Sequence, residues 1–205
     1  MANILAIETS SEACSLALCY NKKVVSFHEE MPKQHTEKLL GLLEGMMKKE
    51  SMDFCELDAI AAGCGPGSFT GLRVGASILK GLLLATSKPF VKIDTLEALA
   101  LQAMPTGNKI CAILDARKKE VYTAHFFEND GVLERLTPDR ALTPNQLCQE
   151  ITDPTVFIGN GLDSYGSLLT SQLGGKFISN QNKCTDTVAA CAARLAENRF
   201  KNTKT

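Results

Sequence analysis

The stretch ILAIETSSEACSLALCYNKKVVSFHE, residues 4–29, decides the fold of this chain. Apolar and β-branched residues dominate two runs, 4–9 and 13–20, and a third run, 23–29, follows the turn Asn21-Lys22. Connections this short allow only antiparallel pairing of neighbouring strands. The opening segment therefore predicts a three-stranded meander.

The rest of the chain alternates helices and strands, and the pattern starts again after Pro105 and Gly107. Before this boundary we expect helices at 36–49, 68–85 and 95–103 and strands at 57–62 and 90–93. After it we expect strands at 110–114, 120–127, 132–136 and 155–158, a helix from the cap Thr143-Pro144 to 151, and a last helix from the cap Asp186 to about 199.

The order strand, strand, strand, helix, strand, helix therefore occurs twice. An acidic residue ends the first strand of each copy, Glu8 in the first and Asp115 in the second. Two copies of one unit predict two similar lobes that face each other, residues 1–104 and 105–205.

Composition limits the possible functions. A net charge of -1 and a pI of about 6.3 provide no general positive field for nucleic acid, so any such role is local or supplied by a partner. Eight scattered cysteines without a C-x-x-C pair indicate buried thiols in a reducing, cytoplasmic setting. Glu8 and Glu12 interrupt any signal-like start, and Arg73 and Lys80 break the most apolar later segment, so we expect no membrane span.

The glycine loop GCGPGSFTGLRVG, residues 63–75, lies between a predicted strand and a predicted helix. Amide groups at such a helix start can hold an anion, or the glycines can simply allow a tight turn, and both readings stay open. A Walker-type site is excluded because no Gly-Lys-Ser/Thr follows. A Rossmann oxidoreductase fits poorly, because three strands and a helix precede the loop.

The turn Glu8-Thr9-Ser10 places a carboxylate beside hydroxyl groups. Such groups can hold hydrated Mg²⁺ and phosphate, with Asp115 approaching from the other lobe, or they can serve local turn bonding. His28, His35 and His125 form no ligand pair, so we expect no metal site. We also expect no catalytic residues in this chain.

Two helices carry more apolar or glycine surface than one sheet can cover. In the helix 68–85, Arg73, Ser77 and Lys80 form only a narrow polar stripe, so a second surface should cover the helix. In the helix 36–49, Gly41 and Gly45 lie one turn apart, at a cost of about 1 kcal/mol each in an exposed helix. These features predict a partner interface made by Gly41, Gly45, Leu72, Leu79 and Leu83.

Four motifs in order resemble the TsaB (YeaZ) family of bacterial tRNA threonylcarbamoyladenosine (t6A) synthesis. They are ILAIETSSEACSLAL at 4–18, HTEKLL at 35–40, GPGSFTGLRVG at 65–75 and LDARKKEVY at 114–122. The resemblance implies an α/β fold of the duplicated actin-like ATPase (ASKHA, RNase H-like) type. It also implies a non-catalytic subunit that binds and activates the catalytic homologue TsaD.

The same resemblance implies further partners. The ATPase TsaE joins through the complex, tRNAs that decode ANN codons are modified at adenosine 37 through the complex, and the chain alone forms a homodimer through its N-lobe helices. ATP or ADP with Mg²⁺ is expected, if at all, in the assembled complex. Glu8 replaces the Asp of many members, and the chain stops at Thr205, short of a C-terminal segment of longer members.

The catalytic relative has a metal-binding histidine pair that this chain lacks, so we expect no enzyme activity from the chain alone. The alternative is a small ASKHA-type ATPase or phosphotransferase that holds Mg-nucleotide between Glu8 and Asp115. Larger insertions enclose adenosine in such kinases, and 205 residues leave little room for them.

Overall fold

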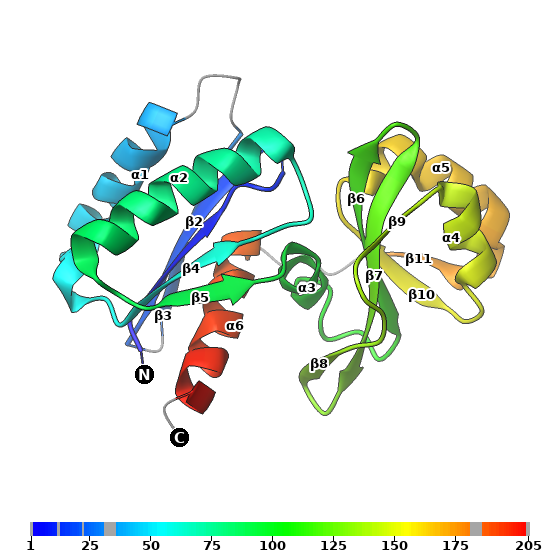
Figure 1. Cartoon of the computed structure of the whole chain (residues 1–205). Helices are drawn as coiled ribbons and strands as arrows, with labels where there is room; N and C mark the ends of the chain where they lie inside the picture. The colour runs from blue at the N-terminus through cyan, green and yellow to red at the C-terminus, as the bar shows by residue number, and fades with distance from the viewer. Residues whose placement is uncertain (1, 12, 22, 31–35, 181–185, 204–205) are drawn as a thin grey trace. The chain divides into compact units, whose positions relative to one another are not determined.

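The computed structural model describes residues 2–11, 13–21, 23–30, 36–180 and 186–203, with the backbone alone at 13, 26–30, 36–38 and 203. The chain forms two compact units (Figure 1). Unit 1 comprises Met1–Thr95 with Asp186–Thr205, and unit 2 comprises Leu96–Thr185.

Unit 1 is built on a five-stranded sheet in the order β3-β2-β1-β4-β5. The predicted meander is confirmed, because β1 pairs antiparallel with β2 and β2 pairs antiparallel with β3. The later strands β4 and β5 run parallel to β1. The strand bounds are β1 Ile4–Glu8, β2 Ala13–Tyr20, β3 Lys23–Glu30, β4 Ala59–Gly63 and β5 Phe90–Ile93.

Helices cover both faces of this sheet. Helices α1 (Thr36–Lys49) and α2 (Phe69–Thr86) share a core with one set of alternate strand residues, including Leu5 and Ile7. Helix α6 (Val188–Thr203) packs on β1 and β2 from the other set, where the Ser15 hydroxyl accepts the Ala189 N–H at 3.2 Å. Both faces of the sheet are therefore buried, which is why β1 is buried along its whole length and apolar from Ile4 to Ile7.

Unit 2 repeats the arrangement with the strand order β11-β10-β6-β7-β8, and β9 pairs with β7. Helices α4 and α5 pack Leu147, Leu169 and Leu173 against the sheet residues Cys111 and Phe157. The described residues also form two short 3-10 helices, η1 (Phe54–Glu56) in unit 1 and η2 (Gly174–Lys176) in unit 2. The remaining bounds are α3 Thr95–Leu101, β6 Lys109–Arg117, β7 Glu120–Asn129, β8 Val132–Arg135, β9 Arg140–Leu142, α4 Pro144–Glu150, β10 Thr155–Ile158, α5 Gly161–Leu173 and β11 Phe177–Ser179.

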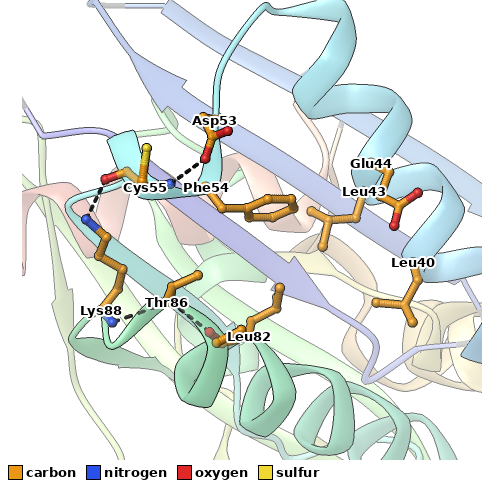
Figure 2. Close-up of a pocket in the computed structure, with 10 residues that line it drawn as sticks. Leu40, Leu43, Glu44, Asp53, Phe54, Cys55, Leu82, Thr86 and Lys88 are labelled. Carbon is orange, nitrogen blue, oxygen red and sulfur yellow. Dashed lines mark hydrogen bonds between the residues drawn. The ribbon is translucent and has the colours of Figure 1, made fainter.

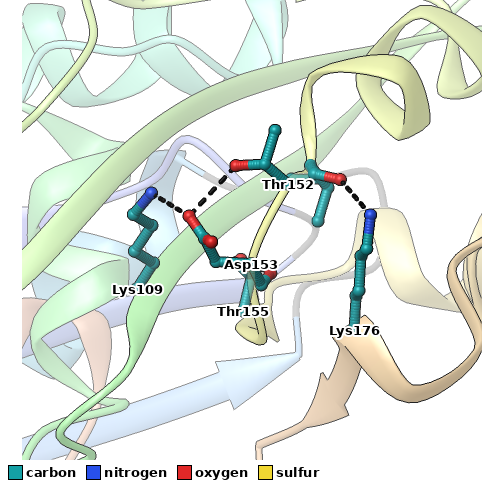
Figure 3. A network of polar contacts seen from close by, with 6 residues as sticks. Lys109, Thr152, Asp153, Thr155 and Lys176 are labelled. Atoms are coloured by element: carbon teal, nitrogen blue, oxygen red, sulfur yellow. Dashed lines mark hydrogen bonds and ion pairs between the residues drawn. The ribbon is translucent and has the colours of Figure 1, made fainter.

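A polar network ties the amino-terminal ends of β6 and β10 together (Figure 3). The Lys109 ammonium donates to the Asp153 carboxylate, which also accepts the Thr152 hydroxyl at 3.0 Å. The hydrogen bond from Lys109 holds the pKa of Asp153 below its ordinary value. Lys176 adds a contact to the Ile151 carbonyl at 3.3 Å. These contacts fix the end of the sheet away from Asp115.

The predicted duplication is confirmed, because both sheets have the same strand order. In each copy a strand and a helix follow the repeated pattern: β5 and α3, expected at 90–93 and 95–103, in the first, and β11 and the expected last helix α6 in the second. Helix α5 and the three-residue strands β9 and β11 were absent from the prediction. The cap of α4 is as predicted, since the Thr143 hydroxyl accepts the Gln146 N–H and Pro144 is the first residue of the helix.

The predicted lobes, 1–104 and 105–205, need correction at two places. The first unit ends at Thr95, and the last helix returns to it. The small buried side chains Ala189, Ala193 and Ala196 allow α6 to lie close on the sheet of unit 1. The predicted cap Asp186 pairs instead with Arg194 at 2.7 Å, and the Thr187 hydroxyl accepts the Ala190 N–H at 3.1 Å.

Candidate functional site

The turn after β1 lies directly against the glycine loop. The Ser68 N–H donates to the Ser10 carbonyl at 2.6 Å. A Cβ added at Gly71 would lie 1.9 Å from the Thr9 carbonyl oxygen, and one at Gly75 would lie 2.3 Å from the Thr9 hydroxyl oxygen. These glycines therefore serve close backbone packing of α2 on the turn, which supports the tight-turn reading of the loop. Anion binding by the loop stays a prediction.

Glu8 is buried at the centre of this contact, with 1% of its surface exposed. Its Oε1 accepts the Ser10 N–H at 2.6 Å, and its Oε2 accepts the Thr95 hydroxyl at 3.4 Å. Burial raises the pKa of Glu8, and the hydrogen bonds from Ser10 and Thr95 oppose that rise. A Cβ at Gly63 would lie 1.7 Å from Oε2, so a larger residue here would displace the Glu8 carboxylate from its present position.

Asp115 occupies the matching place in unit 2, near the carboxyl end of β6. Its Oδ1 accepts the Arg117 N–H at 2.7 Å, and its Oδ2 accepts the Ser164 hydroxyl at 3.1 Å. Its own N–H donates to the Asn160 side chain at 3.1 Å. The sequence thus placed Glu8 and Asp115 at corresponding strand ends, and each carboxylate is held by donors of its own unit.

The assignment of Glu8, Thr9, Ser10 and Asp115 to Mg-nucleotide stays a prediction. The Ser10 hydroxyl is buried without a hydrogen-bond partner among the described atoms.

An apolar surface stands out on α2. Phe69 is 68% exposed and Leu84 is 85% exposed, one at each end of the helix. Between them run the exposed residues Arg73, Ser77 and Lys80, and the Arg73 guanidinium lies 3.9 Å from the centre of the Phe69 ring. By length and composition α2 could cross a membrane, yet only 17% of it is buried in the structure.

The neighbouring helix α1 adds glycine surface. Gly41 and Gly45 are exposed, and a Cβ added at either would meet no atom within 4 Å. Leu40 is also exposed. We use the name α1–α2 face for nine of the exposed residues of the two helices: Leu40, Gly41, Glu44, Gly45, Phe69, Arg73, Ser77, Lys80 and Leu84.

The predicted interface leucines face the interior of unit 1 in part or in full, and their place in an interface stays a prediction. Leu79 is buried in the core of unit 1, and Leu83 packs against that core. Leu72 lies beside Gly65 of the glycine loop. The residues that sequence reasoning missed are Phe69 and Leu84. Their signal was present, because spacings of four, four, three and four residues place both on the stripe of Arg73, Ser77 and Lys80.

A pocket with a volume of about 470 Å³ opens between α1, η1 and the end of α2 (Figure 2). Leu43, Phe54 and Leu82 supply apolar lining, and Lys88 donates to the Cys55 carbonyl at 2.6 Å. The lining residues are Leu40, Leu43, Glu44, Asp53, Phe54, Cys55, Leu82, Ala85, Thr86 and Lys88.

Among the residues that the structure describes, no group of three or more His, Cys, Asp or Glu side chains is placed to hold a metal ion. His125 is largely buried in unit 2, and this burial lowers its pKa. The side chain of His28 and all of His35 lie outside the described residues.

Known proteins match the chain over most of its length. The family described as TsaD, tRNA N6-adenosine threonylcarbamoyltransferase, matches residues 27–190. The tRNA threonylcarbamoyladenosine biosynthesis protein TsaB of Escherichia coli is 33% identical over 172 residues, which cover 80% of this chain and 74% of that protein. TsaB of Haemophilus influenzae is 30% identical over 190 residues, covering 87% and 80%.

Solved structures agree on the fold. YeaZ from Pseudomonas aeruginosa superposes with a TM-score of 0.83 at 25% identity, over all of this chain and 94% of that chain. The ROK hexokinase from Thermus thermophilus shares the fold, with a TM-score of 0.55 at 11% identity over 97% and 99% of the two chains. The predicted duplicated actin-like fold is confirmed. The chain belongs to the TsaB (YeaZ) family, a relative of the TsaD family, and takes part in the biosynthesis of threonylcarbamoyladenosine in tRNA.

Proposed function

We propose that this chain is the non-catalytic subunit of a t6A-forming complex, and that it binds and activates a TsaD-like catalytic subunit through the α1–α2 face. The observation that carries the proposal is the exposure of Phe69 and Leu84 on a helix whose opposite side already packs on the sheet. Exposed apolar surface of this kind marks an interaction site.

A membrane is a poorer explanation of the same surface. Helix α2 is part of the layer that covers the sheet of unit 1: Ile78 and Leu79 lie in the core, and Gly71 packs on the backbone of Thr9. Insertion into a bilayer would remove this layer and expose the sheet. Arg73 and Lys80 would also have to enter hydrocarbon.

Two further features of unit 1 suit a helical partner. Gly41 and Gly45 leave open space in which a second helix can approach the α1 backbone closely. The pocket beside Leu40 and Phe54 can accept an apolar anchor from the partner, which is how a few residues come to dominate an interface. Without a TsaD-like subunit, the same face would pair with a second copy of the chain.

The remaining partners belong to the same proposal. A TsaE-like ATPase and tRNA join through the complex, and ATP or ADP with Mg²⁺ acts in the assembled complex. We place the protein in the cytoplasm, because the seven cysteines that the structure describes are free thiols. Burial raises the pKa of the Cys111 thiol to about 12, so this group stays protonated and unreactive.

The alternative, an ATPase or phosphotransferase with Mg-nucleotide on Glu8 and Asp115, draws support from the duplicated topology alone. Glu8 is buried and bonded to Ser10 and Thr95, an arrangement that disfavours a hydrated cation. Calorimetry of the isolated chain with Mg-ATP, with a phosphate-release assay, tests it. Micromolar binding with turnover would favour the alternative.

The leading proposal is tested by mixing the chain with its cognate TsaD-like subunit at micromolar concentration. Size-exclusion chromatography should show one complex, and t6A formation on a tRNA transcript should require both proteins. Separate elution at this concentration, or full t6A formation by the catalytic subunit without this chain, would overturn the proposal. A Phe69→Glu variant should lose co-elution while keeping the circular dichroism spectrum of the parent.

A further inference from the structure

The hairpin between β6 and β7 carries three consecutive cationic residues. The pair Arg117 and Glu120 closes the hairpin, so Lys118 and Lys119 form a two-residue loop. The φ angles of Arg117, Lys118 and Lys119 are 64°, 51° and 66°. All three residues therefore adopt the left-handed conformation, which side chains with a Cβ rarely take.

A second hairpin of the same unit shows what this geometry normally uses. Asn129 pairs with Val132, so Asp130 and Gly131 form the two-residue loop, with φ angles of 49° and 77°. Asp-Gly is a preferred pair for this type of turn, whereas Lys-Lys is not. A residue type that disfavours its own backbone conformation is expected where that residue serves function and not the fold.

The side chains of the loop are available for an external anion. Lys118 and Lys119 are exposed and make no hydrogen bond or ion pair within the part of the chain that the structure describes. The Arg117 side chain is 72% exposed, and its guanidinium lies 3.9 Å from the Asp115 carboxylate. Glu120, which follows the loop, is the neighbouring acid in the sequence.

The base of the hairpin is held in place. Asp115 accepts the Arg117 N–H, and the Ser164 and Asn160 side chains of the neighbouring α5 region bind Asp115 in turn. The cationic loop is therefore presented from an anchored turn, which reduces the entropy lost on binding.

We propose that the hairpin loop at residues 117–119 contacts the phosphate backbone of the tRNA substrate. This inference rests on the proposed function, which supplies the RNA. Exposed lysines on a turn suit an extended polyanion, whereas a nucleotide binds in a concave site lined by fixed polar groups. The net charge of -1 for the whole chain requires that such a contact be local.

The test uses the complex of the full chain with its TsaD-like subunit and a labelled tRNA transcript. The double variant Lys118→Asn with Lys119→Gly installs a preferred turn pair and removes two charges. Its melting temperature should rise by about 2–4 °C, because the strain is relieved. Its affinity for the transcript should fall on the order of tenfold, and the slope of log K against log salt should become shallower by roughly two.

Two controls separate charge from other effects. Lys118→Arg with Lys119→Arg keeps the charge and should bind RNA as the parent does. Lys48→Gln with Lys49→Gln removes the same charge from the exposed end of α1 and should leave the salt slope unchanged.

Three outcomes would overturn the inference: an unchanged slope and affinity in the Asn-Gly variant, an equal loss in the Lys48 and Lys49 variant, or a loss of Mg-ATP binding with RNA binding intact. Failure of the parent proteins to co-elute would count against the proposed function itself. Co-elution of every variant with unchanged RNA binding would count against the hairpin alone.

Discussion

Helices α2 and α5 occupy the same position in the two units, because each follows the strand next to the first strand of its sheet. Their inner faces are alike: Ile78 of α2 and Leu169 of α5 are buried in the two cores. Their outer faces differ. The exposed residues of α5 include Asp163, Ser164, Ser167 and Thr170, whereas those of α2 include Phe69 and Leu84. The fold itself does not require an apolar outer face, so the α1–α2 face indicates a partner.

The largest expected effects concern a feature that both units have. In each unit, a helix or loop packs through a glycine against the first strand of the sheet or the turn that follows it. Gly71→Ala would place a Cβ 1.9 Å from the Thr9 carbonyl, and Gly159→Ala would place one 2.0 Å from the Ile113 carbonyl. Backbone cannot move as a flexible side chain does, so each should lower the free energy of unfolding by about 3 kcal/mol or more. Urea denaturation measures this.

The control for these variants is Gly166→Ala, where the nearest atom is 3.9 Å away. This change should stabilise α5 by up to about 1 kcal/mol. A mild effect of Gly71→Ala, similar to that of the control, would show that close packing is not the reason for the glycine.

The next effect concerns the exposed apolar residues that α2 has on its outer face and α5 lacks. Leu84→Glu on α2 should weaken binding to the TsaD-like subunit by about 2 kcal/mol or more, which is at least roughly thirtyfold. Ser167→Glu on the outer face of α5 should leave binding unchanged. Because both positions are exposed, each should change the free energy of unfolding by less than about 0.5 kcal/mol. Titration calorimetry gives the affinities, and equal losses in both variants would contradict the assignment of the interface to unit 1.

A smaller effect is expected at Gly41 of α1, where stability and affinity for the partner should change in opposite directions. Gly41→Ala should raise the free energy of unfolding by up to about 1 kcal/mol, because the position is helical and open. The same methyl group should weaken the complex, since it occupies the space that a partner helix would use. If stability and affinity both rise, the glycine surface of α1 lies outside the interface.

Much of the fold followed from local patterns. The meander, the helix after Ser68 and the cap at Thr143 have strong sequence signals, and the structure has all three. Helix α5 was missed although Leu162, Tyr165, Leu169 and Leu173 repeat at helical spacing, because Gly161 and Gly166 with several serines weaken the pattern. Strands β9 and β11 have three residues each, too few to show alternation.

The remaining differences between the prediction and the structure depend on tertiary contacts. The return of α6 to unit 1 depends on which sheet its alanines fit, and spacing along the chain carries no such information. At the site, sequence placed Glu8 at the end of β1, but only the structure shows that Ser10 and Thr95 use its oxygens. Phe69 and Leu84 were missed because they lie on the same stripe of α2 as polar residues such as Arg73 and Lys80.

The smallest expected effect is a change in the free energy of unfolding with pH, caused by the buried carboxylate of Glu8 in unit 1. Burial raises the pKa of Glu8 in the folded chain above the ordinary value of about 4.3 that applies when the chain is unfolded. Below pH 4.3 both states hold the proton and this contribution to stability is fully present. As pH rises through the raised pKa, the folded state must ionise a buried group, so the contribution is lost.

Glu8→Gln cannot ionise, and the parent should therefore lose stability relative to this variant as pH increases. Thr95→Val removes a hydrogen bond that lowers the pKa of Glu8 in the folded chain, so the decline should extend to higher pH. Urea denaturation from about pH 4 to pH 8 measures both, and parallel curves for the parent and Glu8→Gln would show that Glu8 is not desolvated in solution.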